Sequence, residues 1–557
     1  MKKIILVLLT FLLASLVACN VPANDTDTAN TADTGIYKDK EEMLTDRDES
    51  PSYNEDEAIK ITLHSTYAAS TSDRVEINEG VIKITQTGCY LVTGSLENGM
   101  LIVDAPQEAK IQIILRDVSI KSESSAPIYI KSCNKCFLTL EGGSVLETKS
   151  SFVNIDENNI DGTIFSKDDL TINGDGSLSL ASIKNGIVCK DDLVISGATL
   201  SISAQNHAID VNNSARLSDC TLESESLNDG IHAENTDDSE KGYIYLIGAT
   251  LKINASGDGL DAGAYAQIED CQIDITTNSS ENSTKGIKAE TGILISGGKI
   301  NISSYDDAIH SNSSLIIKAG ELYLSSNDDG IHADEIIEIY DGQIEIINSY
   351  EGIEALDIKL LGGSISIKAS DDGINAAGGN DQSGFGGQFG AQDNFGRPGG
   401  RPGGMGGMGG MGGSSSDGSI TISGGTIYIN ASGDGIDANG TLEITGGNIT
   451  VCGPTSGDTA VLDFDVSGTI TGGTFVGTGS SMMAQTLSGT TQGVISLSVG
   501  SQTAGTKIIL EDESGQKLFE VTPENNYQIV ILTSDQMVKG ESYTIYVGDL
   551  SGTFEAE

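Results

Sequence analysis

Short runs in which apolar and other residues alternate recur along most of this chain. Leu200 and Ile202, for example, flank a single polar residue, and so do Ile344 and Ile346. Alternation with a period of two predicts β-strands that turn one face toward a core. Signals for helices are missing from the body of the chain, so we expect an all-β fold.

A second pattern, Asp-Gly-Ile or a close variant of it, recurs between these runs. Its middle residue, glycine or alanine, stands at positions 186, 208, 230, 259, 286, 308, 330, 352 and 373, and most of these positions are 22 residues apart. Each repeat holds three alternating runs, which we interpret as three short strands. A short repeat of three strands predicts a right-handed parallel β-helix of triangular coils, each of about 22 residues.

The points where this repeat begins, changes and ends define five segments. We expect a signal peptide at 1–18, a lipidated cysteine and flexible linker at 19–57, irregular first coils or a cap at 58–158, the parallel β-helix at 159–484, and a small C-terminal β cap at 485–557. A glycine- and methionine-rich stretch, 377–418, interrupts the β-helix. Such a stretch cannot bury a core, so we expect a flexible insertion.

The N-terminus predicts where the protein resides. Two lysines precede an apolar run over residues 4–17, which is too short to span a membrane. The run ends in the tetrapeptide LVAC, which resembles a bacterial lipobox and makes Cys19 the expected lipidation site. We therefore expect a lipoprotein on the extracellular face of the cytoplasmic membrane, which contacts the membrane only through its lipid.

The net charge excludes one class of partner and favours another. The chain has 80 acidic against 31 basic residues, and its formal net charge is −49. A nucleic-acid backbone requires a basic surface, so we expect no nucleic acid among the partners. Cations, in contrast, are attracted to such a chain.

The cysteines other than Cys19 are odd in number, and most stand singly within apolar runs, so buried thiols are expected. Cys133 and Cys136 form a CxxC pair, for which a metal half-site, a redox pair and a disulfide staple stay open. No second CxxC accompanies it, which argues against zinc at this pair.

Acidic residues follow the repeat in two columns. In the segment x-Asp-Gly-Ile-x-Ala, the Ile and Ala side chains face the core, so the residue before Gly and the residue after Ile face outward. Four of the five histidines fall in these columns. The acids in the columns, with those just before them, are our candidate metal ligands: Asp229, Asp258, Asp261, Asp306, Asp307, Asp328, Asp329, Glu351, Glu354, Asp371, Asp372, Asp434 and Asp437.

Two interpretations of these columns stay open. Aspartate before glycine is ordinary turn chemistry, because its side chain bonds to nearby backbone. Turn chemistry does not offset the repulsion, however, which for two carboxylates ~5 Å apart is roughly 0.8 kcal/mol in water and about 3 kcal/mol at a dielectric of 20. A stack of carboxylates requires counter-ions, and Ca²⁺ is the favoured cofactor because it prefers carboxylate oxygens. A transition metal at the histidines is the alternative.

Three stretches of sequence resemble a family of bacterial carbohydrate-binding β-helix proteins: GCYLVTGSLENGMLIVDAP at 88–106, DGTIFSKDDLTINGDGSLSL at 161–180 and NGIVCKDDLVISGATLSISA at 185–204. The resemblance implies a pectate-lyase-like fold, calcium binding, and binding of cellulose and polygalacturonate without demonstrated catalysis. It also implies that Asp229, Asp258, Asp307, Asp329 and Asp372 are calcium ligands. His207, Lys285 and Lys288 depart from the acidic pattern.

Three functions follow as hypotheses. The first is a calcium-dependent, cell-surface binder of a polysaccharide, acidic and plant-type such as polygalacturonate, or else cellulose. The side chains expected to contact the sugar are His310, His332, Tyr305, Tyr350 and Lys288. The second is a calcium-dependent polysaccharide lyase that acts by β-elimination, with Lys285 or Lys288 as the base. The third is a structural adhesin or spacer.

Overall fold

The computed structural model describes residues 38–153, 155–278, 283–377, 418–455 and 459–557. These residues belong to one compact unit, Thr34–Glu557. The predicted signal peptide, Cys19 and nearly all of the predicted insertion lie outside the described residues. The part of the chain that is described holds only two short helices, α1 (Lys40–Met43) and α2 (Asp46–Glu49), and neither is long and apolar enough to cross a membrane.

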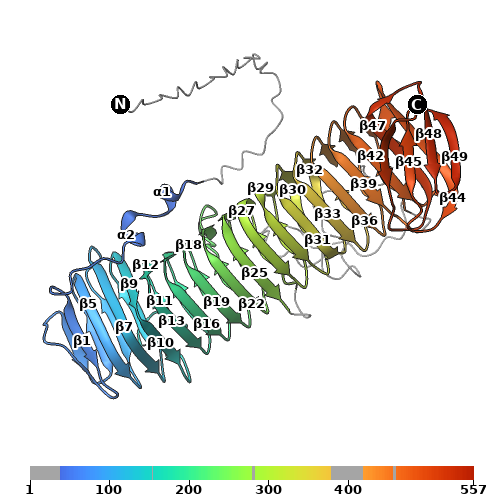
Figure 1. Cartoon of the computed structure of the whole chain (residues 1–557). Coiled ribbons are helices and arrows are strands. Elements are labelled where there is room, and N and C mark those ends of the chain that lie inside the picture. Colours follow the sequence, from blue (N-terminus) through green and yellow to red (C-terminus); the bar gives the residue numbers. More distant parts are fainter. Residues whose placement is uncertain (1–37, 154, 279–282, 378–417, 456–458) are drawn as a thin grey trace, which may run out of the picture. The chain divides into compact units, whose positions relative to one another are not determined.

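Strands of successive coils pair in parallel, which confirms the predicted β-helix (Figure 1). On one face, Leu178, Leu200, Leu222 and Leu251 are partners in an unbroken row. The strands of this face include β10 (Gly143–Thr148), β13 (Ser177–Ser182), β16 (Thr199–Ala204), β19 (Thr221–Ser226), β22 (Thr250–Ala255), β25 (Cys271–Thr277), β31 (Gln343–Ser349), β33 (Ser364–Ala369), β36 (Thr426–Ala431), β39 (Asn448–Cys452) and β42 (Thr474–Gly479).

The face that carries the acidic columns is built from the shortest strands. They are β8 (Ile128–Ser132), β11 (Gly162–Ser166), β14 (Asn185–Cys189), β17 (Ile209–Val211), β20 (Ile231–Ala233), β23 (Leu260–Ala262), β26 (Ile287–Ala289), β28 (Ile309–Ser311), the first residues of β30 (Ile331–Ile339) and β32 (Ile353–Leu360), then β34 (Ile374–Ala376), β37 (Ile436–Ala438) and β40 (Leu462–Phe464). Their inward aliphatic side chains, such as Ile231 and Ile309, are fully buried in one core that runs from Ile61 to Ile531. Because this core fixes each coil against the next, outward side chains are held about 4.8 Å apart.

The third face comprises β9 (Lys135–Glu141), β12 (Asp169–Gly174), β15 (Asp192–Ser196), β18 (Ser214–Ser218), β21 (Tyr243–Ile247), β24 (Tyr265–Glu269), the first parts of β27 (Gly292–Ser303) and β29 (Ser314–Ser325), the ends of β30 and β32, β35 (Ser419–Ile422), β38 (Thr441–Ile444) and β41 (Ser467–Ile470). Residues 38–57, which we call the N-terminal strap, pack against this face. Asp48 is buried and lies 2.7 Å from the Lys135 ammonium, while Met43 and Leu44 pack on Val194 and Tyr245. This part of the segment therefore differs from the expected flexible linker, because its apolar and hydrogen-bonding side chains find partners on the sheet.

Parallel pairing also begins before the predicted boundary at residue 159. Strand β1 (Ile59–Leu63) already pairs in parallel with β5 (Gly88–Leu96), and β5 pairs with β7 (Lys110–Ser122). Antiparallel pairing within 58–158 is confined, among described residues, to β1 with β2 (Ala68–Ala69) and to β3 (Val75–Asn78) with β4 (Val81–Ile84). Residues 58–158 thus hold parallel coils as well as antiparallel edge strands.

The C-terminal region forms the small β cap that the loss of the repeat predicted. Strands β44 (Gln492–Gln502) and β47 (Tyr527–Val538) pair antiparallel, and β47 also pairs antiparallel with β42 of a terminal coil. A four-stranded sheet of β45 (Ile508–Glu511), β46 (Lys517–Val521), β48 (Ser542–Val547) and β49 (Leu550–Glu555) packs beside them around a second core. The cap therefore covers the apolar end of the coil stack.

Candidate metal and glycan site

The two outward columns on the short-strand face form the candidate site, which we call the acidic ladder. The second column stands in continuous register through Asp210, His232, Asp261, Lys288, His310, His332, Glu354, Asn375 and Asp437. Asp463 continues it, and the sequence pattern missed this residue because its coil lacks the Gly-Ile signal. The repeat thus predicted the alignment of side chains from nine different coils.

The first column performs turn chemistry between coils. The backbone N–H of Asp258 donates to Asp229 Oδ1 at 2.8 Å, and that of Lys285 donates to Asp258 Oδ1 at 2.6 Å. The same bond joins Asp329 N–H to Asp307 Oδ1 at 2.9 Å. These bonds use one carboxylate oxygen and leave Oδ2 near the second column. The ladder divides into three stretches according to what lies near those oxygens.

In the histidine stretch, residues 207–261, imidazoles face the carboxylates. His207 Nδ1 lies 2.9 Å from Asp229 Oδ2, and His232 Nδ1 lies 2.8 Å from Asp261 Oδ2. The two rings stack with centroids 4.7 Å apart. The neighbouring carboxylates raise the pKa of His232 to about 9 although burial opposes its protonation. Without a bound metal ion, the His232 ring is therefore favoured in its protonated form.

In the lysine stretch, residues 285–354, the chain supplies its own cation. Lys285 is 1% exposed, and its ammonium lies 2.7 Å from Asp306 Oδ2 and 3.4 Å from Asp307 Oδ2. Although burial disfavours the charged carboxylate, Lys285 and a hydrogen bond with His310 hold the pKa of Asp307 well below its usual range. The carboxylates buried in this stretch are Asp306, Asp307, Asp328, Asp329, Glu351 and Glu354. Negative charge therefore exceeds the single buried ammonium.

Two residues expected to contact sugar are inaccessible in this stretch. His310 and His332 are 2% and 0% exposed, and their Nδ1 atoms lie 2.7 Å from Asp307 Oδ2 and 3.0 Å from Asp329 Oδ2. Their assignment to carbohydrate contact is therefore wrong, because each ring is enclosed with its carboxylate. Tyr305 and Tyr350 are half-buried.

The lysines considered as lyase bases are poorly suited to that role. Lys285 is buried in its ion pairs, so its amine has no access to a polymer. Lys288 is partly exposed, with its ammonium 3.8 Å from Asp261 Oδ1. Burial opposes its charge, yet Asp261 and Asp258 raise the pKa of Lys288. A general base must be unprotonated at working pH, and this environment opposes that state.

In the aspartate stretch, residues 371–437, the ligand atoms are all oxygens. Asp371, Asp372, Asp434 and Asp437 are half-buried, and no described lysine, arginine or histidine forms an ion pair with Asp371, Asp372 or Asp437. Burial and the charge of Asp434 raise the pKa of Asp372 to about 8 and that of Asp437 to about 7. Asp371, Asp372 and Asp437 thus concentrate negative charge without an ion pair to a described lysine, arginine or histidine.

Two further observations at the aspartate stretch fit a hard cation such as Ca²⁺. The Oδ1 atom of Asn375 is a buried acceptor with no hydrogen-bond partner among the described residues. A Cβ atom on Gly433 would collide with Oδ1 of both Asp371 and Asp372, so glycine preserves the space beside these oxygens. Carboxylate and amide oxygens are the ligands that Ca²⁺ prefers, and these residues would hold it.

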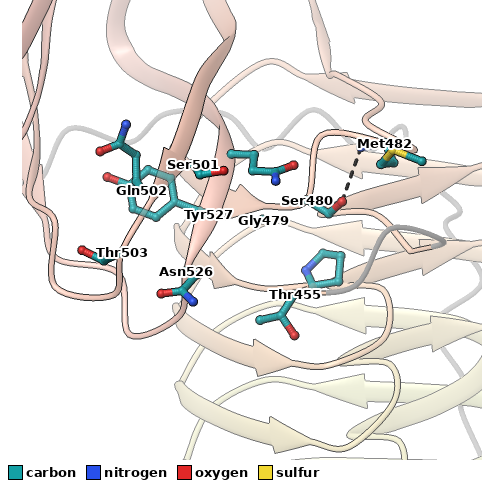
Figure 2. Close-up of a pocket in the computed structure, with 11 residues that line it drawn as sticks. Thr455, Gly479, Ser480, Met482, Ser501, Gln502, Thr503, Asn526 and Tyr527 are labelled. Atoms are coloured by element: carbon teal, nitrogen blue, oxygen red, sulfur yellow. Dashed lines mark hydrogen bonds between the residues drawn. The ribbon is translucent and has the colours of Figure 1, made fainter.

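A separate pocket of about 450 Å³ lies between a terminal coil and the cap (Figure 2). Its eleven lining residues include Ser480, Gln502, Asn526, Tyr527 and Gln528, and none of the eleven is charged. Sequence reasoning missed this pocket because its residues come from four separate segments with no shared motif. Hydroxyl and amide groups around an uncharged hollow are suited to hydrogen-bond a neutral polar ligand.

Comparison with known proteins identifies the family. A family model described as carbohydrate-binding domain-containing protein matches residues 78–330 and 313–459, which include all three stretches of the ladder. A carbohydrate-binding domain-containing protein of Acetivibrio thermocellus is 31% identical over 224 residues, which cover 39% of this chain and 78% of that protein. A solved structure described as the polysaccharide lyase-like protein from C. thermocellum, gadolinium derivative, is 26% identical, with a TM-score of 0.37, and covers 52% of this chain and 100% of its own. The chain therefore belongs to the family of carbohydrate-binding domain-containing proteins.

Proposed function

We propose that this protein binds an acidic polysaccharide of the polygalacturonate type at the cell surface, through Ca²⁺ held on the acidic ladder. The observation that carries the proposal is the aspartate stretch, where four half-buried carboxylates gather beside a buried amide oxygen with no described partner. Carboxylates without an ion pair, such as Asp371, Asp372 and Asp437, are costly to bury, and a bound cation removes that cost.

The residues of the stretch would hold and orient the polymer in a defined way. Asp372, Asp434 and Asp437 come from two coils that are adjacent in the stack, and Asn375 lies beside Asp437 in register. Bound Ca²⁺ takes six to eight oxygens, so positions left open by these side chains are available to a uronate carboxylate. The regular spacing of the coils then presents charge along a line, as a polymer of repeating uronates requires.

Binding is favoured over cleavage by the state of the two lysines. A lyase requires an unprotonated base beside the sugar, whereas Lys285 is enclosed in ion pairs and Lys288 is held in its charged form by Asp261. We therefore expect retention of the polymer without formation of unsaturated uronate. A pure spacer, the remaining alternative, would retain no polymer.

A neutral glycan such as cellulose is a second candidate, which the uncharged pocket of Figure 2 favours. Gln528 lines this pocket with an exposed side chain, whereas Asp437 belongs to the ladder. Loss of glycan binding in Gln528→Ala but not in Asp437→Asn would move the binding function from the ladder to the pocket.

Attachment through a lipid on Cys19 belongs to the same proposal. Residue 38 is the first described residue, and the strap that follows is fixed to the body by both of its hydrogen bonds with Gln267. We expect the wild-type precursor to incorporate a labelled fatty acid and to sediment with membranes. The Cys19→Ser variant should lose both properties.

The main test is a glycan array probed with and without a chelator. Polygalacturonate should be retained in Ca²⁺ and released by EDTA, and Asp437→Asn should weaken retention by on the order of tenfold or more, since one ligand is removed. Glu443→Gln is the matched control, because Glu443 is an exposed acid of the neighbouring strand β38 outside the ladder. Retention that ignores both the chelator and Asp437→Asn would refute the proposal.

A further inference from the structure

We propose that His207, Asp229, His232 and Asp261 form a binding site for a borderline divalent transition metal, with Zn²⁺ as the best-fitting ion. This site lies in the histidine stretch and is distinct from the calcium ligands of the aspartate stretch. The proposal goes beyond glycan binding and does not depend on it.

The ligand atoms of His207, Asp229 and His232 all lie within 4.8 Å of one another, and Asp261 adjoins them through His232. Asp229 Oδ2 lies 2.9 Å from His207 Nδ1 and 3.4 Å from His232 Nδ1, and the latter nitrogen lies 2.8 Å from Asp261 Oδ2. A tetrahedral ion with ligands at about 2.0–2.1 Å separates neighbouring ligand atoms by about 3.3 Å. The observed separations lie on either side of that value, so small side-chain movements suffice to complete the shell.

Partners outside the shell orient Asp229 and His232. Asp229 Oδ1 accepts the backbone N–H of Asp258 at 2.8 Å, which turns Oδ2 toward the rings. His232 Nε2 lies 3.4 Å from Glu234 Oε2, a carboxylate placed to accept its N–H. Metal-bound histidines characteristically donate their other N–H to such a partner.

The ring of His207 has a comparable partner. Its Nε2 atom lies 3.2 Å from the side-chain amide of Asn228, and turning that amide over presents Oδ1 as the acceptor for Nε2–H. Both imidazoles are then free to offer Nδ1 to the ion. Register between β20 and β23 holds His232 directly opposite Asp261, so the backbone fixes this part of the shell.

An unsatisfied atom points to a ligand. His207 Nδ1 is buried and forms no hydrogen bond with the described residues, although Asp229 Oδ2 lies 2.9 Å away, because the geometry of that contact is unsuitable. A buried ring nitrogen without a partner is unusual in a native protein, and a bound ion would satisfy it. Two carboxylates and two neutral imidazoles also balance the charge of a divalent cation.

The ligand chemistry selects the class of metal. Imidazole nitrogen suits zinc and other late first-row ions, whereas Ca²⁺ and Mg²⁺ prefer oxygen. The histidine stretch supplies two imidazole nitrogens, and the aspartate stretch supplies only oxygens. One chain thus offers two sites of different selectivity on the same face.

The second histidine pair of the ladder provides an internal control. His310 and His332 stack at the same centroid distance of 4.7 Å, but each ring hydrogen-bonds a carboxylate of its own coil. The Lys285 ammonium, which is buried, lies 3.4 Å from Asp307 Oδ2, whereas the ammonium beside the first pair, that of Lys288, is partly exposed and lies 3.8 Å from Asp261 Oδ1. The side chains of His207 and His232 are 14% and 19% exposed, against 2% and 0% for the second pair, so a hydrated ion reaches only the first.

The test uses the full chain, freed of metal and kept in excess Ca²⁺, titrated with Co²⁺. Four-coordinate Co²⁺ absorbs visible light strongly, so we expect an intense spectrum that saturates at one ion per chain and disappears when Zn²⁺ displaces it. Zn²⁺ should also raise the midpoint of thermal unfolding, because it binds only the folded site. A pale six-coordinate spectrum, or no saturation at one equivalent, overturns the proposal without any variant.

Variants then locate the ion. His232→Gln should weaken Co²⁺ binding by on the order of 100-fold or more, since loss of even an outer partner costs 10–100-fold. Asp261→Asn should also weaken it, while His310→Gln and the distant His64→Gln should leave it unchanged. Unchanged binding in His232→Gln and Asp261→Asn, or loss in His310→Gln alone, overturns the assignment. Glycan retention in these variants is scored separately, so failure of either proposal is visible alone.

Discussion

The lysine and aspartate stretches present the same two columns, yet they compensate carboxylate charge by different means. In the lysine stretch a buried ammonium, that of Lys285, lies 2.7 Å from Asp306. In the aspartate stretch Asp372 and Asp437 have no described cation, and their pKa values are raised to about 8 and 7 by burial and neighbouring charge. The difference teaches that a repeating backbone can carry a region with a built-in cation and a region without one.

The same comparison explains why Lys285 is not available as a catalytic base. A cation on the chain is permanent, whereas a bound ion can be exchanged and can share its coordination with a ligand. We therefore assign stability to the lysine stretch and recognition to the aspartate stretch. The predictions below test this division, starting with the largest expected effect.

Removing the built-in cation should unfold or severely weaken the protein. Lys285→Met leaves Asp306 and Asp307 buried without their ammonium, and breaking such a pair costs about 3–5 kcal/mol in the free energy of unfolding. Chemical denaturation measures the loss. Lys288→Met is the control, because Lys288 is partly exposed and its nearest acid is 3.8 Å away, so its effect should stay below about 1 kcal/mol. Equal losses in the two variants would contradict the division.

Calcium should stabilise the protein through the aspartate stretch. An ion whose free concentration is 100 times its dissociation constant adds about 2.7 kcal/mol to the free energy of unfolding. Thermal unfolding in millimolar Ca²⁺ and in EDTA should therefore differ by several degrees, and Asp372→Asn should remove most of that difference. Asp306→Asn, in the lysine stretch, should lower stability overall but keep the calcium increment. A loss of the increment only in Asp306→Asn would reverse the assignment.

Space beside the carboxylates should matter as much as their charge. A Cβ atom in Gly433→Ala meets Oδ1 of Asp371 and Asp372. We therefore expect the free energy of unfolding to fall by about 2 kcal/mol and the stabilisation by Ca²⁺ to become smaller. Gly143→Ala is the control, because the nearest atom to its added Cβ is 3.6 Å away. Calorimetric titration with Ca²⁺ separates the two variants, and equal calcium affinity in both would show that Gly433 serves only the backbone.

Much of this organisation was readable from the chain because it repeats. The recurring Asp-Gly-Ile signal predicted the alignment of His232, Asp261 and Lys288, although 29 and 27 residues separate them, since consecutive coils must place equivalent residues in register. The burial of His310 and His332 was not predictable, because the pattern indicates which face a side chain takes and says nothing of what encloses it.

The N-terminal strap escaped prediction for a related reason. Its residues have a polar, linker-like composition, and the stability of such a segment depends on partners far along the chain. Asp48, for example, bonds to Thr171 and lies beside Lys135, contacts that no local pattern encodes. Sequence periodicity therefore predicted the repeat well and the non-repeating contacts poorly.

The smallest expected effect concerns the strap, where Asp48 is compensated by the chain as in the lysine stretch. Burial disfavours its charge, but Lys135, Thr171 and Thr45 together lower the pKa of Asp48. A lowered carboxyl pKa contributes stability above the unfolded value of about 3.9, and this contribution is lost as pH falls through the folded value. The free energy of unfolding of the wild type should therefore exceed that of Asp48→Asn by about 1 kcal/mol at pH 6 and by progressively less below pH 4.

Denaturant unfolding of wild type and Asp48→Asn at several pH values measures the difference between their free energies of unfolding. Subtracting one value from the other removes the contribution of every other acid. The aspartate stretch should behave in the opposite sense without Ca²⁺, because the raised pKa of Asp372 makes its charged form the costly one. Neutralising it in Asp372→Asn should then raise metal-free stability at pH 7 more than at pH 5. A gap for Asp48 that stays constant with pH would show that its hydrogen bonds, rather than its charge, hold the strap in place.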